Sequence, residues 1–328
     1  MTVPDDFTGA QPITVALVNN MPDAAFVDTE NQFRAAAMSS GSQIEFELYT
    51  IKEVPRSDSV AELVEERYRG LDELWTRPPE ALIVTGTEPT QADMRSEPSW
   101  PYLARLLEWA SENVRTTMLS CLAAHASALL FDGIERVARP VKCSGVFEGA
   151  VENSFDPLTA GLPELVSVPH SRLNEVPTSA LVDAGYRILV GSGCWGTGWS
   201  VAAREQGNGR FVLCQGHPEY GTLSLLREYR RDVRRCIFGH SAVPYPRLPE
   251  GYLGEEAVEK LTEFEHRART TGADPRGLWP AFPFEEVAAT VENNWASAAA
   301  TFYANWLQLA QAAVSHRADD AMLRRAAA

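Results

Sequence analysis

Short apolar runs recur between residues 13 and 120, and stretches with a helical pattern separate them. The runs lie at 13–18, 44–49, 81–86 and 117–120, and the helical stretches at 28–39, 60–74 and 100–111. Apolar runs of this length are typical of parallel strands that are covered on both faces. Their alternation with helices predicts an α/β fold, a doubly wound and mostly parallel sheet flanked by helices. Ligands bind such sheets beyond the carboxyl ends of the strands.

The last of these runs ends at Cys121, and small helix-forming residues follow it directly. This pattern predicts a strand, a sharp turn and a helix, with the thiol close to the helix N-terminus. The partial positive charge there favours the thiolate, which is the nucleophilic form of cysteine. Taken alone, the stretch is better interpreted as a buried structural cysteine in an α/β core.

A second predicted strand end carries a histidine and a carboxylate. The apolar run at 210–214 leads into a glycine-led turn that contains His217 and Glu219. Residues i and i+2 of an extended backbone face the same side, so Glu219 could orient the imidazole. Cys121, His217 and Glu219 would then be a nucleophile, a base and an orienting carboxylate. The spacing alone also allows an ordinary surface histidine.

The middle of the chain is predicted to be rich in strands and its end rich in helices. We expect strands at 141–151, 165–168, 187–191 and 199–203, loops at 169–172 and 191–198, and a helix at 223–238. Prolines and glycines after residue 240 mark a change in organisation. Further helices are expected at 255–271 and 285–315, with a loop at 274–284 between them and a frayed tail from residue 316.

These features divide the chain into four segments. Residues 1–12 are expected to be a flexible tail, and 13–245 the main domain. Residues 246–284 would be a linker with a charged helix. Residues 285–328 would be a C-terminal helical extension that packs on the main domain or on a dimer partner.

Charge and cysteine content exclude several classes of function. The formal net charge of −15 repels polyanions, which argues against nucleic-acid binding. No run approaches the roughly 20 apolar residues of a membrane span, and the polar, acidic start does not resemble a signal peptide. The five cysteines form no CxxC pair, so neither a disulfide framework nor a metal site is expected. A cytoplasmic location follows from these features.

A series of short motifs occurs in a characteristic order along the chain. They are NMP at 20–22, TENQF at 29–33, LIVTG at 82–86, Lys142 with SGVFE at 144–148, PHSR at 169–172, GHPEY at 216–220, EY at 228–229, RD at 231–232, Trp295, and NWL at 305–307. In these motifs the chain resembles a divergent member of the homoserine O-succinyltransferase and O-acetyltransferase family, which has the class I glutamine-amidotransferase-like fold.

The resemblance implies an enzyme that moves an acyl group from coenzyme A to the side-chain hydroxyl of homoserine or a related hydroxy amino acid. Cys121 would form the acyl thioester, His217 would be its base and Glu219 the orienting carboxylate, in a ping-pong mechanism. The substrates would be a succinyl- or acetyl-CoA and an amino acid. The resemblance implies a homodimer and no bound cofactor.

Further residues follow from the same resemblance. Lys142, Ser171 and Arg231 stand at substrate-binding positions, and Arg231 could hold the amino-acid carboxylate through two hydrogen bonds. Lys142 could equally be an edge residue of a strand, and Ser171 a turn residue. Thr90 occupies the position linked to the choice between succinyl and acetyl donors and matches neither pattern, so the donor stays open.

The oxyanion of the tetrahedral intermediate needs fixed N–H donors. The backbone N–H of Leu122, where the family usually has tryptophan, and that of Gly86 or Thr87 are the candidates. Two other hypotheses remain. One is a glutamine-amidotransferase-like hydrolase that uses the same three catalytic residues, and the other is a binding protein on a decayed enzyme fold.

Overall fold

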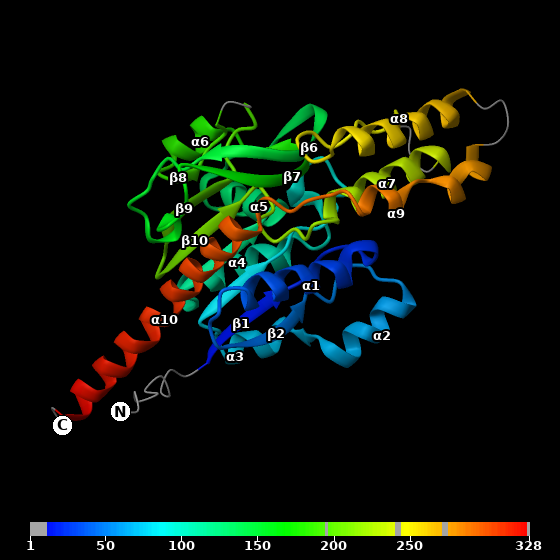
Figure 1. The fold of residues 1–328 in the computed structure, drawn as a ribbon. Coiled ribbons are helices and arrows are strands. Elements are labelled where there is room, and N and C mark those ends of the chain that lie inside the picture. Colours follow the sequence, from blue (N-terminus) through cyan, green and yellow to red (C-terminus); the bar gives the residue numbers. More distant parts are fainter. Residues whose placement is uncertain (1–11, 194–195, 240–243, 271–274, 327–328) are drawn as a thin grey trace, which may run out of the picture.

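A mostly parallel sheet forms the centre of the molecule (Figure 1). The computed structural model describes residues 12–193, 196–239, 244–270 and 275–326. The sheet has eight strands in the order β3-β2-β1-β4-β5-β10-β9-β8. Their bounds are β1 (Ile13–Val18), β2 (Ile44–Thr50), β3 (Arg69–Gly70), β4 (Ala81–Val84), β5 (Thr116–Ser120), β8 (Arg187–Val190), β9 (Val201–Gln206) and β10 (Gly209–Cys214). Every pair from β3 to β10 is parallel, and the pairs β10–β9 and β9–β8 are antiparallel. The predicted fold class is confirmed.

Helices cover both faces of this sheet because each face carries its own apolar core. One core joins the sheet to α3 (Leu71–Thr76), α4 (Trp100–Asn113), α5 (Leu122–Asp132) and α6 (Thr178–Asp183). The other joins it to α1 (Asp23–Met38), α2 (Asp58–Arg67) and the C-terminal α10 (Ala296–Ala326), which runs beside α1. Trp306 of α10 is fully buried, and its indole N–H donates to the Thr116 hydroxyl at 2.9 Å. The predicted C-terminal helix is therefore anchored on the sheet.

A ribbon and a helical lobe lie beyond one side of the sheet (Figure 1). The ribbon pairs β6 (Val137–Ala150) with β7 (Leu165–Glu175) in antiparallel fashion. The lobe has a third apolar core, which gathers α7 (Ser224–Ile237), α8 (Glu255–Thr270), the 3₁₀ segment η3 (Pro275–Ala281) and α9 (Phe284–Ala288). Two more 3₁₀ segments are η1 (Met94–Ser96) and η2 (Pro157–Thr159). Within the described residues, no helix is both long and apolar enough to cross a membrane.

Several predicted elements were wrong in extent. The helix expected at 60–74 divides into α2, β3 and α3. The backbone of Tyr68 is extended and ends α2, and its hydroxyl donates to Glu30 Oε2 at 2.8 Å. The helix expected to start at residue 28 begins at Asp23, directly after Pro22. The loop expected at 169–172 lies inside β7, where Pro169 pairs with Val146 of β6.

The C-terminal region also departs from the prediction. The single helix expected at 285–315 is α9 followed, after a break, by α10. The buried Trp295 lies in this break, and its indole N–H donates to the Tyr220 carbonyl at 2.7 Å. Helix α10 continues to Ala326, where a frayed tail was expected from residue 316. The predicted loop at 274–284 contains η3. The predicted N-terminal tail lies, except for residue 12, outside the described residues.

Candidate active site

Three adjacent parallel strands end at the same edge of the sheet and deliver the predicted catalytic residues there. Strands β4, β5 and β10 are neighbours, and their carboxyl ends lead to Gly86, Cys121 and His217. The backbone N–H of Cys121 donates to the carbonyl of Cys214, the last residue of β10, at 2.7 Å. The structure therefore brings residues from three distant stretches of sequence to one place.

Cys121 occupies a sharp turn between β5 and α5. Its φ of 51° and ψ of −108° lie in a region that residues with a Cβ rarely adopt. Among the described residues it is the only non-glycine with a positive φ. Such a conformation costs of order 1–3 kcal/mol and persists only where the surrounding structure enforces it. A strained strand-to-helix turn presents a nucleophile at the top of a sheet, next to the N-terminus of a helix.

His217 and Glu219 form a buried pair next to this thiol. His217 Nδ1 lies 2.8 Å from Glu219 Oε1, and the Ser120 hydroxyl donates to the same oxygen at 3.1 Å. With the Nδ1 proton held by the carboxylate, Nε2 is the imidazole nitrogen available to the thiol. Burial lowers the pKa of His217, but the Glu219 carboxylate and a hydrogen bond with Cys121 outweigh it and raise the pKa to about 10. The imidazole is therefore cationic at neutral pH and stabilises a thiolate.

The turn that carries His217 is fixed from several sides. The His217 N–H donates to the Pro169 carbonyl at 2.8 Å, and the Tyr220 ring stacks on the imidazole with centroids 4.3 Å apart. Gly216 is needed here, because a Cβ would lie 2.4 Å from Val168.

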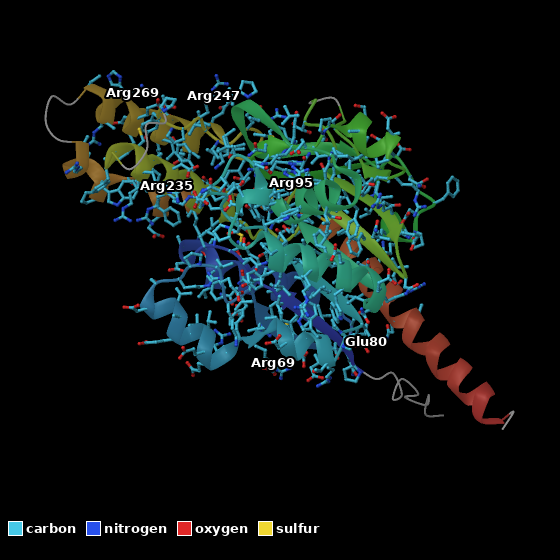
Figure 2. All side chains as sticks on the ribbon, turned by 180° about the vertical axis from the view of Figure 1, so that it is seen from behind. Arg69, Glu80, Arg95, Arg235, Arg247 and Arg269 are labelled. Atoms are coloured by element: carbon cyan, nitrogen blue, oxygen red, sulfur yellow. The ribbon has the colours of Figure 1, made fainter. Side chains whose placement is uncertain are left out.

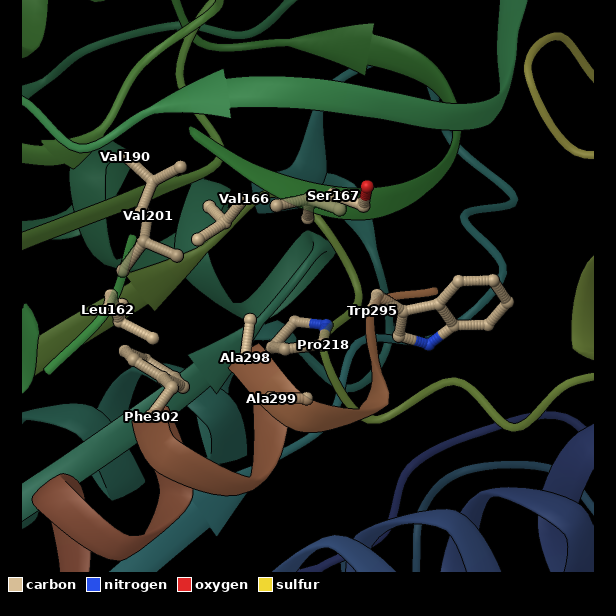
Figure 3. A pocket seen from close by; sticks show the side chains of 11 residues that line it. Leu162, Val166, Ser167, Val190, Val201, Pro218, Trp295, Ala298, Ala299 and Phe302 are labelled. Carbon is tan, nitrogen blue, oxygen red and sulfur yellow. The ribbon is translucent and has the colours of Figure 1, made fainter. Parts of the chain in front are cut away.

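Behind the turn, Pro218 lines a small pocket together with Trp295 of the C-terminal region (Figure 3). All residues that line this pocket are apolar except Ser167, so it offers no charged or titratable side chain. Pro218 belongs to the turn that carries His217, but Cys121, His217 and Glu219 do not line the pocket.

The Gly86 loop lies against the first turn of α5. A Cβ at Gly86 would be 2.9 Å from the backbone nitrogen of Leu122, so only glycine leaves that N–H open. Thr85 holds the loop, since its hydroxyl accepts from Asn20 N–H at 2.8 Å and donates to the Gly86 carbonyl at 2.9 Å. The structure thus brings Leu122 and Gly86 together, and the half-exposed Thr87 follows in the same loop.

The three predicted substrate residues also converge, around two carboxylates of α7. Lys142 Nζ of β6 lies 2.7 Å from Asp232 and 3.4 Å from Glu228. The Ser171 hydroxyl of β7 donates to Glu228 Oε2. Arg231 donates through Nε to Asp232 at 3.0 Å, and its terminal nitrogen lies 3.8 Å from Glu228. We call Lys142, Ser171, Glu228, Arg231 and Asp232 the α7 cluster.

The α7 cluster is connected to His217 through Tyr220. The Tyr220 hydroxyl donates to Glu228 Oε1, while its ring stacks on His217. Burial favours the neutral form of Glu228, but Lys142 and Arg231 outweigh it and lower the pKa of this carboxyl. Glu228 therefore stays ionised at neutral pH. Burial and this same carboxylate raise the pKa of Tyr220, so its hydroxyl keeps the proton that it donates to Glu228.

Thr90 lies further along the Gly86 loop. Its backbone N–H and hydroxyl donate to the two oxygens of Glu97, at 2.6 and 2.9 Å. Glu97 thereby orders the loop around Thr90. Within the described residues, no group of three or more His, Cys, Asp or Glu side chains could hold a metal ion.

Comparison with known proteins shows the family to which this chain belongs. The family model for homoserine O-succinyltransferase matches residues 7–316. The chain is 38% identical to homoserine O-succinyltransferase of Rhodopseudomonas palustris, over 93% of this chain and 90% of that protein. It is 40% identical to the protein of the same name from Methylorubrum extorquens, over 90% of this chain and 87% of that protein. The chain belongs to the homoserine O-succinyltransferase family. It is therefore an acyltransferase, as the sequence motifs indicated.

The chain is also similar to solved structures of more distant proteins. One is a glutamine amidotransferase from Thermotoga maritima, with 12% identity and a TM-score of 0.45 over 92% of this chain and 99% of that chain. Another, from Methylobacillus flagellatus, has 12% identity and a TM-score of 0.48 over 92% of this chain and 96% of that chain.

Four residues of the site were not predicted individually. Tyr220, Glu228 and Asp232 lie within motifs that the chain shares with the homoserine O-succinyltransferase family, so a signal for them existed. Ser120 precedes Cys121 in a buried strand, where a serine has no distinctive pattern. Its contact with Glu219 emerges only once β5 and β10 are adjacent.

Proposed function

We propose that this protein transfers an acyl group from coenzyme A to the side-chain hydroxyl of homoserine through a thioester on Cys121. The observation that carries the proposal is the strained Cys121 turn beside the buried His217–Glu219 pair. The names of the family and of its relatives supply the acceptor and favour succinyl-CoA as donor. The homodimer implied by the resemblance and the cytoplasmic location expected from the composition remain predictions.

In the first step, the Cys121 sulfur attacks the carbonyl carbon of the acyl thioester. The oxyanion that forms accepts hydrogen bonds from the N–H of Leu122 and from that of Gly86 or Thr87. As the intermediate collapses, the bond to the sulfur of coenzyme A breaks. The His217 imidazolium gives its proton to the departing thiolate, so coenzyme A leaves as a thiol.

The second step depends on the loss of the negative charge of the Cys121 thiolate in the first step. A Cys121 thioester carries no negative charge and no longer supports the imidazolium, so the pKa of His217 falls. The neutral imidazole then takes the proton of the acceptor hydroxyl, and the hydroxyl oxygen attacks the thioester. Collapse of this intermediate releases the ester and returns Cys121 as a thiolate beside a protonated His217.

The α7 cluster is the proposed acceptor site because it holds charges of both signs. An amino acid presents a carboxylate and an ammonium group together. Arg231 and Lys142 can receive the carboxylate, and Glu228, which stays ionised, can receive the ammonium. Tyr220 joins this cluster to His217, so a bound acceptor would lie close to its base.

Thiol release from acyl-CoA in the presence of homoserine tests the proposal. We expect release with succinyl-CoA, parallel lines in double-reciprocal plots and no release by Cys121→Ala. Cys236→Ala is the matched control, because Cys236 is another free, partly exposed thiol outside the site and its removal should leave the rate unchanged.

Persistent turnover by Cys121→Ala would exclude the covalent route. Release of glutamate from glutamine without any acyl-CoA would favour the hydrolase. The same assay with acetyl-CoA compares the rates with the two donors, the choice that the resemblance links to Thr90.

A further inference from the structure

Helix α7 carries two rows of arginines, each with its members four residues apart. Residues at this spacing lie on the same side of a helix. In one row, Arg231 belongs to the α7 cluster, and Arg235 pairs with both oxygens of Glu88 at 2.8 and 3.1 Å. Because Glu88 follows Gly86 by two residues, Arg235 faces the Gly86 loop. Arg230 and Arg234 form the other row.

The second row rests on aromatic rings of the helical lobe. The Arg230 guanidinium lies 4.8 Å from the ring centre of Phe284 and 5.5 Å from that of Trp279. The Arg234 guanidinium lies 5.4 Å from the ring centre of Phe238, and Phe238 meets Trp279 edge to face at 6.2 Å. All three rings are partly exposed. We call these five residues the arginine–aromatic patch.

The two guanidinium groups of the patch are not neutralised. In the part of the chain that the structure describes, neither Arg230 nor Arg234 forms a salt bridge, whereas Arg227, Arg231 and Arg235 of the same helix all do. The chain has 44 acidic and only 29 basic residues, yet these two arginines lie without a salt bridge on neighbouring turns of one helix. A guanidinium stacked on a ring keeps the N–H donors around its edge free, and these suit phosphate oxygens.

We propose that the arginine–aromatic patch binds the 3′-phosphoadenosine diphosphate end of the acyl-CoA donor. This inference rests on the proposed function, which makes an acyl-CoA the donor. The phosphates would accept hydrogen bonds from Arg230 and Arg234, and the adenine would stack on the exposed aromatic or guanidinium surface. Both interactions match a ligand that is at once anionic and aromatic.

The position of the patch suits this ligand. Arg230 precedes Arg231 in the sequence, and Arg234 precedes Arg235. Four residues advance a helix by only about 6 Å, so the patch lies within about one turn of the α7 cluster along the helix axis. Figure 2 labels Arg235 on the helical lobe, and its partner Glu88 lies on the Gly86 loop. The pantetheine arm would run from the patch past the Arg235–Glu88 ion pair towards the sulfur of Cys121.

Titration calorimetry with adenosine 3′,5′-bisphosphate tests the patch without relying on catalysis. We expect the nucleotide to bind the intact protein and coenzyme A to compete with it. The double variant Arg230→Ala/Arg234→Ala should weaken binding at least about tenfold, the effect of losing one good charge-assisted contact. Arg105→Ala is the matched control: Arg105 also lies over a tryptophan, Trp75, at 5.5 Å, but on α4, and its loss should change nothing.

A kinetic comparison of two donors separates nucleotide binding from chemistry. In the double variant, the KM for acyl-CoA should rise, while kcat/KM for the matching N-acetylcysteamine thioester, which has no nucleotide, and the KM for homoserine stay unchanged. An equal loss with both donors, or no change with either, would overturn the patch. If no donor supports transfer in the intact protein, the proposed function fails, and the nucleotide titration still decides whether the patch binds its ligand.

Discussion

Replacing Cys121 by glycine should leave the protein more stable than replacing it by alanine, although both variants lose the nucleophile. The reason is the backbone at this position, with φ at 51° and ψ at −108°. Alanine keeps the Cβ that makes this conformation unfavourable, whereas glycine adopts positive φ readily. Comparing the two variants therefore isolates the strain from the loss of the thiol.

The size of the difference follows from two opposing terms. Relief of the strain should stabilise the glycine variant by ~1–3 kcal/mol. The greater freedom of glycine in the unfolded chain should destabilise it by ~0.5–1 kcal/mol. The expected net result is a glycine variant more stable than the alanine variant by about 1 kcal/mol, within the ~0–2.5 kcal/mol that the two terms span, the opposite of the usual order.

Guanidinium unfolding of both variants, followed by circular dichroism, measures this difference as a shift in the midpoint. Ala126→Gly in the same helix is the control, since Ala126 is buried in regular α5 and its replacement should destabilise in the usual way. An alanine variant at residue 121 that equals or exceeds the glycine variant in stability would refute the strain argument.

Three further predictions concern the catalytic turn and the buried histidines. Gly86→Ala would place a methyl group 2.9 Å from the backbone N–H that we assign to the oxyanion, so kcat should fall on the order of 10²-fold with an unchanged circular dichroism spectrum; full activity would exclude that donor. Glu219→Gln removes the charge that raises the pKa of His217 to about 10, so the alkaline limb of kcat/KM for the acyl donor should move to lower pH; an unmoved limb would contradict the pairing. Burial lowers the pKa of His125 to about 4 from 6.5, so its neutral form contributes ~3 kcal/mol of stability above pH 6.5 that is lost as the pH falls towards 4; denaturation of His125→Gln should show a weaker acid dependence, and an equal slope would exclude this origin.

The sheet and its catalytic edge could be predicted because they depend on local patterns. Buried apolar runs at 13–18, 44–49, 81–86, 117–120 and 210–214 predicted parallel strands, and parallel strands place their carboxyl ends on one edge. Cys121 and His217 therefore met as expected. Ordered motifs then favoured the interpretation of Cys121 as a nucleophile over that of a buried thiol, which the Cys121 stretch alone could not do.

The α7 cluster could not be assembled from local patterns. Lys142, Ser171 and Glu228 come from two ribbon strands and a helix, and only tertiary packing brings them together. The interpretation of Ser171 as a turn residue was wrong for the same reason. A serine two residues after a proline suggests a turn, yet β7 continues through Pro169 and Ser171 because β6 pairs with it.

The break before α10 was missed because the helical pattern continues through it. Trp295 and Trp306 are both buried, and in sequence they look like one apolar face. In the structure, Trp295 instead reaches the Tyr220 carbonyl, and this contact requires the chain to leave the helix. A long-range hydrogen bond of this kind leaves no periodic signal.

The thioester on Cys121 can be measured directly by intact-protein mass spectrometry. Mixing the protein with succinyl-CoA in the absence of acceptor should add the mass of one succinyl group, and peptide mapping should place it on Cys121. Adding homoserine should remove the group and yield the acylated amino acid, while Cys121→Ala should gain no mass. Acyl transfer to homoserine without any acyl group on Cys121 would contradict the covalent mechanism.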